Sequence, residues 1–189
     1  MNRRNFLQAA GSAAFNAAIF GGVAANSIVV PAYGTPSAAA PPQARRLAFV
    51  NTHTGDTFSD AYWENGNYVP DAMAAINHVM RDHRSGEVFA MDPRLLDQLH
   101  RLNGLVEASA PFQIISGYRS PATNAALHEA SSGVATRSLH MDGRANDIRI
   151  RGVELSRLRD AALSMNAGGV GYYEASDFIH VDTGRVRRW

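Results

Sequence analysis

The amino-acid sequence contains no cysteine. Disulfide bonds therefore cannot stabilise the fold, and the chain must fold around a hydrophobic core. Its 18 basic residues are all arginine, so lysine is absent as well. These absences exclude a thiolate nucleophile, a P-loop lysine, a Schiff-base lysine and a Ser-Lys dyad, because a guanidinium group cannot replace an amine. A bound metal would have to be held by histidine, aspartate or glutamate.

The composition is typical of one soluble domain with an extension. Of the 189 residues, 46% are hydrophobic and 19% are charged. The formal net charge is only +1, whereas proteins that bind nucleic acids usually carry a concentrated basic surface. We therefore expect no nucleic-acid partner.

Residues 1–39 have the features of an export signal. Arg3 and Arg4 precede an apolar run that ends near Val30 and is interrupted by glycine and asparagine. Small residues and prolines follow, and cleavage is expected after Ala39. The pattern predicts a twin-arginine signal peptide, so the export machinery would be a partner and the mature protein would be periplasmic, without membrane contact. An uncleaved membrane anchor is the alternative.

The remaining sequence predicts a linker at residues 40–46 and a single α+β domain at residues 47–189. Period-two alternation and turn residues predict strands at 47–51, 57–62, 112–115, 147–150, 169–173 and 178–181. Helical spacing and N-terminal caps predict helices from Pro70 to about Gly86, from Pro93 to Val106, from Pro121 to about Ala130, and over 154–165. We expect a small, mostly antiparallel sheet with flanking helices.

The second predicted helix is expected to supply much of the core. Asp92 is a favourable N-cap residue, and Pro93 suits the first turn of a helix. Apolar residues then recur at helical spacing, and all are expected to be buried: Leu95, Leu96, Leu99, Leu102, Leu105 and Val106.

Two short segments carry residues that could bind a metal. In one, His140 and Asp147 are separated by a turn in which Gly143 permits the chain to fold back. In the other, strand alternation places His180 and Asp182 on one face. Two imidazoles and one carboxylate form a ligand set for a catalytic zinc ion, which keeps a fourth position open for water. By spacing alone, such residues are more often polar surface residues than a metal site.

Arg119 lies between a predicted strand and a predicted helix. This position suits a guanidinium group that reaches into a cleft and binds a carboxylate. The alternative is a surface arginine that pairs with a helix-capping carboxylate.

The C-terminal residues 185–189 include three arginines and end in Trp189. They could form a basic tail. We favour a terminal strand with a packed tryptophan, because an indole is largely apolar and is usually buried in part.

Three motifs then occur in order along the chain. They are Ser-Gly-Tyr-Arg-Ser-Pro at 116–121, Ser-x-His-x-x-Gly-x-Ala-x-Asp at 138–147, and Asp-Phe-Ile-His-Val-Asp-Thr-Gly-Arg-Val-Arg-x-Trp at 177–189. Together they resemble the zinc D-alanyl-D-alanine peptidases of the hedgehog-like metallopeptidase superfamily, and they are most similar to its murein endopeptidase K-like branch. The resemblance covers about residues 45–189.

The resemblance implies roles for four residues. His140, Asp147 and His180 would bind one zinc ion per chain, and Arg119 would hold the substrate or stabilise the developing oxyanion. Zinc chemistry agrees with the composition, because a metal-activated water attacks an amide without a cysteine or lysine nucleophile.

Two aspartates are candidates for the general base. Family members often have glutamate three residues before the last histidine ligand, where this chain has Asp177. Strand alternation points Asp177 away from the face that carries His180 unless the chain bends there. Asp182 lies on that face and could act as the base or as a partner that orients a ligand imidazole.

The resemblance implies a zinc-dependent murein endopeptidase that hydrolyses peptide cross-links between peptidoglycan stem peptides. The L,D cross-links between diaminopimelate residues, of the 3-3 type, are one candidate bond. A D,D-endopeptidase or carboxypeptidase is the alternative among enzymes. A non-catalytic murein-binding scaffold is the alternative outside enzymes, because the usual glutamate is missing.

Overall fold

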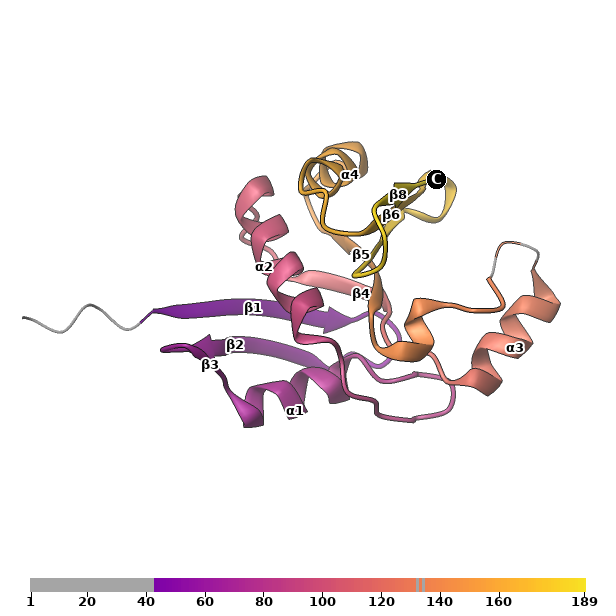
Figure 1. Ribbon diagram of the computed structural model, residues 1–189, viewed down its shortest axis with the longest axis horizontal. Coiled ribbons are helices and arrows are strands. Elements are labelled where there is room, and N and C mark those ends of the chain that lie inside the picture. The colour runs from indigo at the N-terminus through magenta and orange to yellow at the C-terminus, as the bar shows by residue number, and fades with distance from the viewer. Residues whose placement is uncertain (1–42, 132, 134) are drawn as a thin grey trace, which may run out of the picture. The chain divides into compact units, whose positions relative to one another are not determined.

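A computed structural model describes residues 43–131, 133 and 135–189 (Figure 1). The expected signal segment at residues 1–39 lies outside this part of the chain. The strands are β1 (Ala44–Asn51), β2 (Thr57–Glu64), β3 (Asn67–Tyr68), β4 (Phe112–Ser116), β5 (Ala145–Ile150), β6 (Gly169–Tyr173), β7 (Phe178–Asp182) and β8 (Arg187–Arg188). The helices are α1 (Pro70–Val79), α2 (Pro93–Val106), α3 (Pro121–Ala130) and α4 (Leu155–Ser164), with short 3-10 helices η1 (Leu139–Asp142) and η2 (Glu174–Ser176).

The described strands form a single sheet in the order β3-β2-β1-β4-β5-β7-β6-β8. Neighbouring strands are antiparallel except for the pairs β1–β4 and β6–β8. The predicted α+β fold with a mostly antiparallel sheet is therefore confirmed. Pairing of β8 with β6 also confirms the terminal strand expected at the C-terminus. The sheet begins earlier than expected, because Ala44 of the expected linker already pairs with Glu64 of β2.

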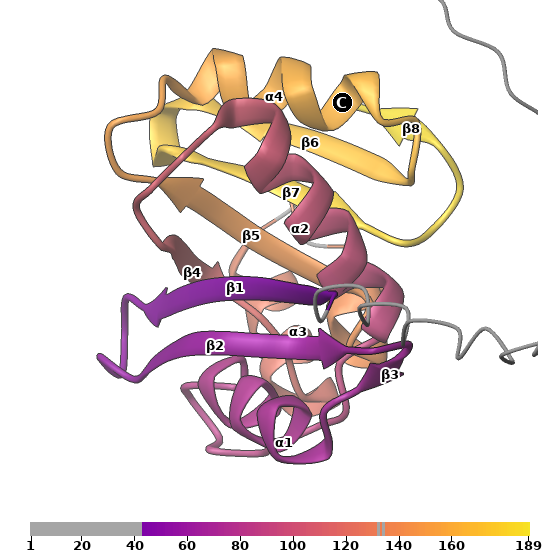
Figure 2. The ribbon, with the colours of Figure 1, turned by 90° about the vertical axis from the view of Figure 1, so that its left-hand side faces the viewer.

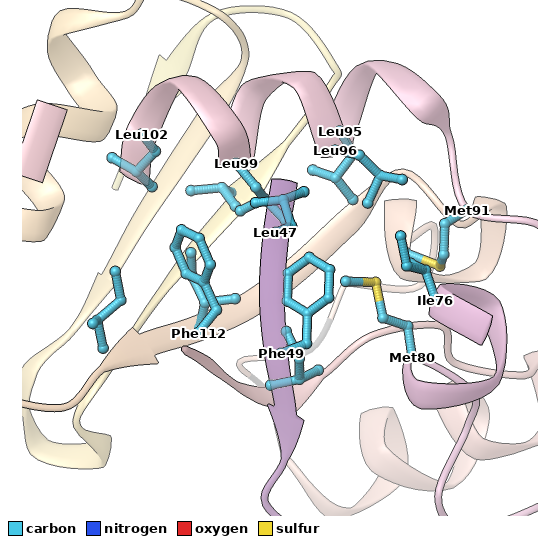
Figure 3. Close-up of a cluster of buried hydrophobic side chains, with 14 of the residues drawn as sticks. Leu47, Phe49, Ile76, Met80, Met91, Leu95, Leu96, Leu99, Leu102 and Phe112 are labelled. Atoms are coloured by element: carbon cyan, nitrogen blue, oxygen red, sulfur yellow. The ribbon is translucent and has the colours of Figure 1, made fainter. Parts of the chain in front are cut away.

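The hydrophobic core covers one face of this sheet. Helix α2 crosses in front of the strands, whereas α3 lies behind them (Figure 2). The buried leucines of α2 meet Leu47 and Phe49 of β1 and Phe112 of β4, and Ile76 of α1 packs beside them (Figure 3). Helix α4 adds buried residues, whereas the buried residues of α3 are polar. The opposite face of the sheet is therefore free of the main core.

Helix α1 ends at Val79, earlier than the predicted end near Gly86. The carbonyl of Met80 accepts a hydrogen bond from the Tyr118 backbone N–H at 2.7 Å, so that segment takes the place of a further helical turn. The buried carboxylate of Asp82 then accepts bonds from the backbone N–H groups of Arg84 and Ser120. These bonds hold the following loop against the start of α3.

The exposure of Leu105 also differs from the sequence prediction. Its side chain is 47% exposed, whereas Leu99 on the same helix is fully buried. The apolar stripe of α2 is therefore narrower than the leucine pattern indicates, because one leucine lies beyond the edge of the sheet-facing side.

We expect Leu99→Ala to lower the free energy of unfolding by about 2–5 kcal/mol, because it removes buried methyl groups and leaves a cavity. Leu105→Ala is the matched control and should cost about 1 kcal/mol or less. Urea unfolding followed by circular dichroism measures both. Equal losses for the two variants would contradict the placement of α2.

Candidate metal centre

Three side chains converge on the face of the sheet that is opposite the core. His140 comes from η1, Asp147 from β5 and His180 from β7. One ligand atom from each lies within 4.8 Å of the others. The Asp147 Oδ1 atom is 2.9 Å from His180 Nδ1 and 3.2 Å from His140 Nε2. The structure therefore brings together the residues that the sequence named as metal ligands.

Strand register positions two of the three ligands. Asp147 and His180 are direct partners in the antiparallel pair β5–β7. Their neighbours Ile148 and Ile179 also face each other and are fully buried in the core. Because side chains alternate along a strand, burial of the isoleucines directs the aspartate and the histidine to the opposite face.

A tight turn brings the third ligand to the same place. The hydroxyl of Ser138 accepts a hydrogen bond from the His140 backbone N–H and starts η1. Gly143 ends it in the left-handed region, with φ of 65°. A Cβ at Gly143 would also overlap the carbonyl of Ala90, so both conformation and space require glycine. The chain thus folds back between His140 and Asp147, as the sequence predicted.

Hydrogen bonds to the outer imidazole nitrogens fix which nitrogen faces the centre. His140 Nδ1 donates to the Gly117 carbonyl at 2.7 Å, since a carbonyl can only accept. His180 Nε2 donates to Asp182 Oδ2 at 2.9 Å. The unprotonated nitrogens, His140 Nε2 and His180 Nδ1, then point toward Asp147. Such outer bonds are typical of metal-binding histidines, because they orient the ring and raise its basicity.

The donor set fits a zinc ion. Two neutral imidazoles and one carboxylate are the ligand types of catalytic zinc sites, which leave a fourth position open. Burial alone raises the pKa of Asp147, but the neighbouring His140 and His180 imidazoles outweigh it and hold that pKa well below its usual range. The carboxyl group is therefore ionised and available as a ligand.

Asp182 lies behind this centre and is fully buried. Besides His180, it accepts hydrogen bonds from the Arg187 guanidinium and from the backbone N–H groups of Gly169 and Gly184. Burial opposes ionisation, but these bonds hold the pKa of Asp182 well below its usual range. Both oxygens of Asp182 thus already accept hydrogen bonds, which suits a partner that orients the His180 imidazole. The geometry favours the positioning role among the two roles predicted for Asp182.

Asp177 is placed differently from what strand alternation predicts. It follows η2 in the left-handed conformation, with φ of 54° and ψ of 51°, immediately before β7. Its carboxylate accepts a hydrogen bond at 2.8 Å from Arg149, which shares the Asp147 face because the two are two residues apart on β5. The bend that could bring Asp177 to this face is thus present. The side chain is 65% exposed and does not line the cavity described next.

A cavity of about 360 Å³ opens beside the three ligands. Arg119 lies on its wall and is 9% exposed. Its Nη2 is 3.5 Å from Asp147 Oδ2 and donates to the Ser116 hydroxyl, whereas its buried Nε has no partner among the described residues. Burial lowers the pKa of Arg119, although a guanidinium stays charged in proteins. The structure therefore favours the cleft-facing arginine over the surface arginine.

The same cavity has residues that the sequence analysis did not assign to the site. Arg137 and Arg187 add two guanidinium groups, and Tyr173, Phe178 and Trp189 form an aromatic wall. Phe178, Arg187 and Trp189 belong to the last of the three sequence motifs, but the sequence predicts only packing for Trp189. Its position could not be derived from a local pattern, because Trp189 reaches the site through pairing of β8 with β6.

This fold and centre define the class: a metallopeptidase-type site on an α+β domain. Residues 38–189 match the family described as Peptidoglycan L,D-endopeptidase MepK, and the chain belongs to that family. The relative of that name from Escherichia coli K12 is 44% identical over 188 residues, which cover 100% of this chain and 97% of the relative. A probable peptidoglycan L,D-endopeptidase MepK from Haemophilus influenzae is 41% identical over 78% of this chain and 80% of its own length. The family resemblance is therefore confirmed.

The positioning role of Asp182 is testable through metal binding. Asp182→Asn should weaken zinc affinity by about 10- to 100-fold, because the His180 ring loses its charged partner. Competition with a fluorescent zinc chelator measures this affinity. Asp177→Asn is the control and should bind zinc like the unchanged chain. Unchanged zinc affinity in Asp182→Asn would refute the positioning role.

Proposed function

We propose that the chain is a zinc-dependent murein endopeptidase that hydrolyses the peptide cross-links of peptidoglycan. The observation that carries this proposal is the convergence of two imidazoles and a carboxylate beside an open cavity. Membership in the family described as Peptidoglycan L,D-endopeptidase MepK supports both the reaction and the substrate.

In this proposal, His140, Asp147 and His180 hold one zinc ion per chain. When bound, zinc lowers the pKa of water from about 15.7 to about 7 and polarises the scissile carbonyl. Arg119 presents its guanidinium from the cavity wall beside Asp147 and would stabilise negative charge on the carbonyl oxygen. A preorganised contact of this kind contributes roughly 2.7–4 kcal/mol to the transition state.

We assign the general-base role to Asp177. Its side chain is 65% exposed and is bonded to Arg149, whose position on β5 shares the face of Asp147, whereas the carboxylate of Asp182 is buried and accepts hydrogen bonds through both oxygens. Arg149 holds the Asp177 side chain, and Gln113 accepts a bond at 2.6 Å from the Arg149 Nε. A base held in this way would accept the proton of the attacking water.

The proposed substrate is the cross-linked stem peptide, with the L,D bond between diaminopimelate residues as the preferred target. The relatives carry L,D-endopeptidase in their names, which supports this choice over D,D-cleavage. Peptidoglycan lies outside the cytoplasm, so we propose an extracytoplasmic location. We further propose that residues 1–39 are a twin-arginine signal that brings the protein to the periplasm. No helix in the part of the chain described here is long and apolar enough to cross a bilayer.

The reaction is tested by mass spectrometry of muropeptides released from cross-linked sacculi. With zinc, we expect loss of cross-linked dimers and fragment masses that correspond to cleavage of the L,D bond; a chelator should abolish both. Loss of terminal D-alanine with intact dimers would instead indicate a carboxypeptidase. Binding to sacculi without any cleavage would indicate a scaffold, and either result would refute the endopeptidase.

The base assignment is tested with Asp177→Asn. This variant should lower kcat by about 100- to 10,000-fold while zinc content stays the same, because the amide cannot accept the proton. Asp160→Asn is a closely matched control: the Asp160 side chain is 64% exposed and pairs with Arg159 at 2.8 Å, as Asp177 pairs with Arg149. Asp160→Asn should be fully active. Full activity of Asp177→Asn would remove Asp177 from the mechanism.

A further inference from the structure

Trp189 packs beside one of the candidate metal ligands, His180. The backbone of Trp189 pairs with β6: its N–H donates to the Val170 carbonyl, and its own carbonyl accepts from the Tyr172 N–H. The indole Nε1–H donates to the Tyr173 hydroxyl at 2.8 Å. The centre of the indole lies 5.2 Å from that of the His180 ring. Backbone hydrogen bonds, an indole hydrogen bond and a ring contact therefore fix the orientation of Trp189.

The neighbouring residues leave space for this indole. At Gly171, a Cβ would lie 2.7 Å from the Trp189 Cε2 atom, so any larger residue on β6 would displace the ring. The Arg187 guanidinium lies 4.8 Å from the ring centre and is itself held by Asp182. Gly171, Arg187 and Tyr173 thus hold the indole at a single position.

Despite these contacts, half of Trp189 remains exposed. It lines the cavity beside the metal ligands together with Tyr173 and Phe178, whose rings stack on each other at 4.6 Å. A tryptophan that only stabilises the fold contributes most to the free energy of folding when it is fully buried. A rigid indole that keeps an apolar face open at a polar site is instead typical of residues that bind ligands, because little entropy is lost on binding.

We propose that Trp189 is a substrate-binding residue of the peptidase. With Tyr173 and Phe178 it forms an apolar wall that packs against the methylene chain of a diaminopimelate residue at the cleaved bond. The guanidinium groups and metal ligands elsewhere in the cavity suit carboxylate and amide groups, so this wall provides the apolar contact that an aliphatic side chain needs. The inference rests on the proposed function and assigns one of its binding surfaces.

Tryptophan fluorescence tests the contact directly. The chain has two tryptophans, so Trp63→Phe leaves Trp189 as the only emitter. Trp63 lies on β2 beside Arg45 and outside the cavity, and its replacement should leave activity unchanged. The probe is a glycan-free, diaminopimelate cross-linked peptide dimer. We expect the emission maximum to shift to shorter wavelengths and to saturate near the KM for that peptide, because the ligand excludes water from the indole.

Kinetics on the same peptide separate binding from folding. Trp189→Ala should raise KM about tenfold and change kcat less, because an apolar contact to the bound substrate is lost. Trp189→Phe, which keeps an aromatic ring, should lie between that variant and the unchanged chain. Val186→Ala is the control, since Val186 is 59% exposed in the same terminal segment and does not line this cavity. Its KM should not change.

The outcomes distinguish this inference from the proposed function. Hydrolysis of the peptide without an emission shift, or with KM unchanged in Trp189→Ala, overturns the role of Trp189. An emission shift that requires glycan-bearing fragments also overturns it, because the indole would then contact sugars. A saturable shift without hydrolysis supports the role of Trp189 and refutes the peptidase. The absence of both shift and hydrolysis refutes both.

Discussion

The pairing of Asp147 with His180 across β5 and β7 is the constraint on which the site depends. A slip of β7 by one residue against β5 would move His180 to the core face and Ile179 to the site face. Burial of Ile179 opposite Ile148 therefore fixes the register, because the slipped register would bury a polar imidazole in the core and expose a large apolar side chain. Core packing on one face of the sheet thus determines the geometry of the candidate metal site on the other.

Charge compensation keeps this centre stable although it is buried. Asp147 has the imidazoles of His140 and His180 on one side and the Arg119 guanidinium on the other. Asp182 is compensated by Arg187 and by backbone donors. A buried charge without such partners would be strongly destabilising. Because each ring already has its outer hydrogen bond, the ligands are oriented before any ion binds, and little reorganisation is needed for binding.

The sequence predicted more of the fold than of the catalytic arrangement. Helices and strands with a clear period, such as α2 and β5, were found close to their observed bounds. The predicted end of α1 was wrong, because the Met80 carbonyl accepts a hydrogen bond from Tyr118, almost forty residues later in the chain. The side of the sheet taken by Asp177 could not be derived either. Strand alternation starts only at Phe178, and Asp177 itself has a left-handed backbone that no period describes.

The sequence by itself determined the chemistry available to this protein. The absence of cysteine and lysine excludes thiol and amine nucleophiles and leaves histidine, aspartate and glutamate as the ligands for a metal. The ordered motifs around His140, Asp147 and His180 identified the candidate ligands. Only the tertiary structure decided that Asp182 accepts a hydrogen bond from His180, and that the Trp189 ring lies beside the His180 ring. The physical reason is that periodicity reports the face on which a residue lies, whereas contacts between distant segments depend on how strands pair and how the core packs.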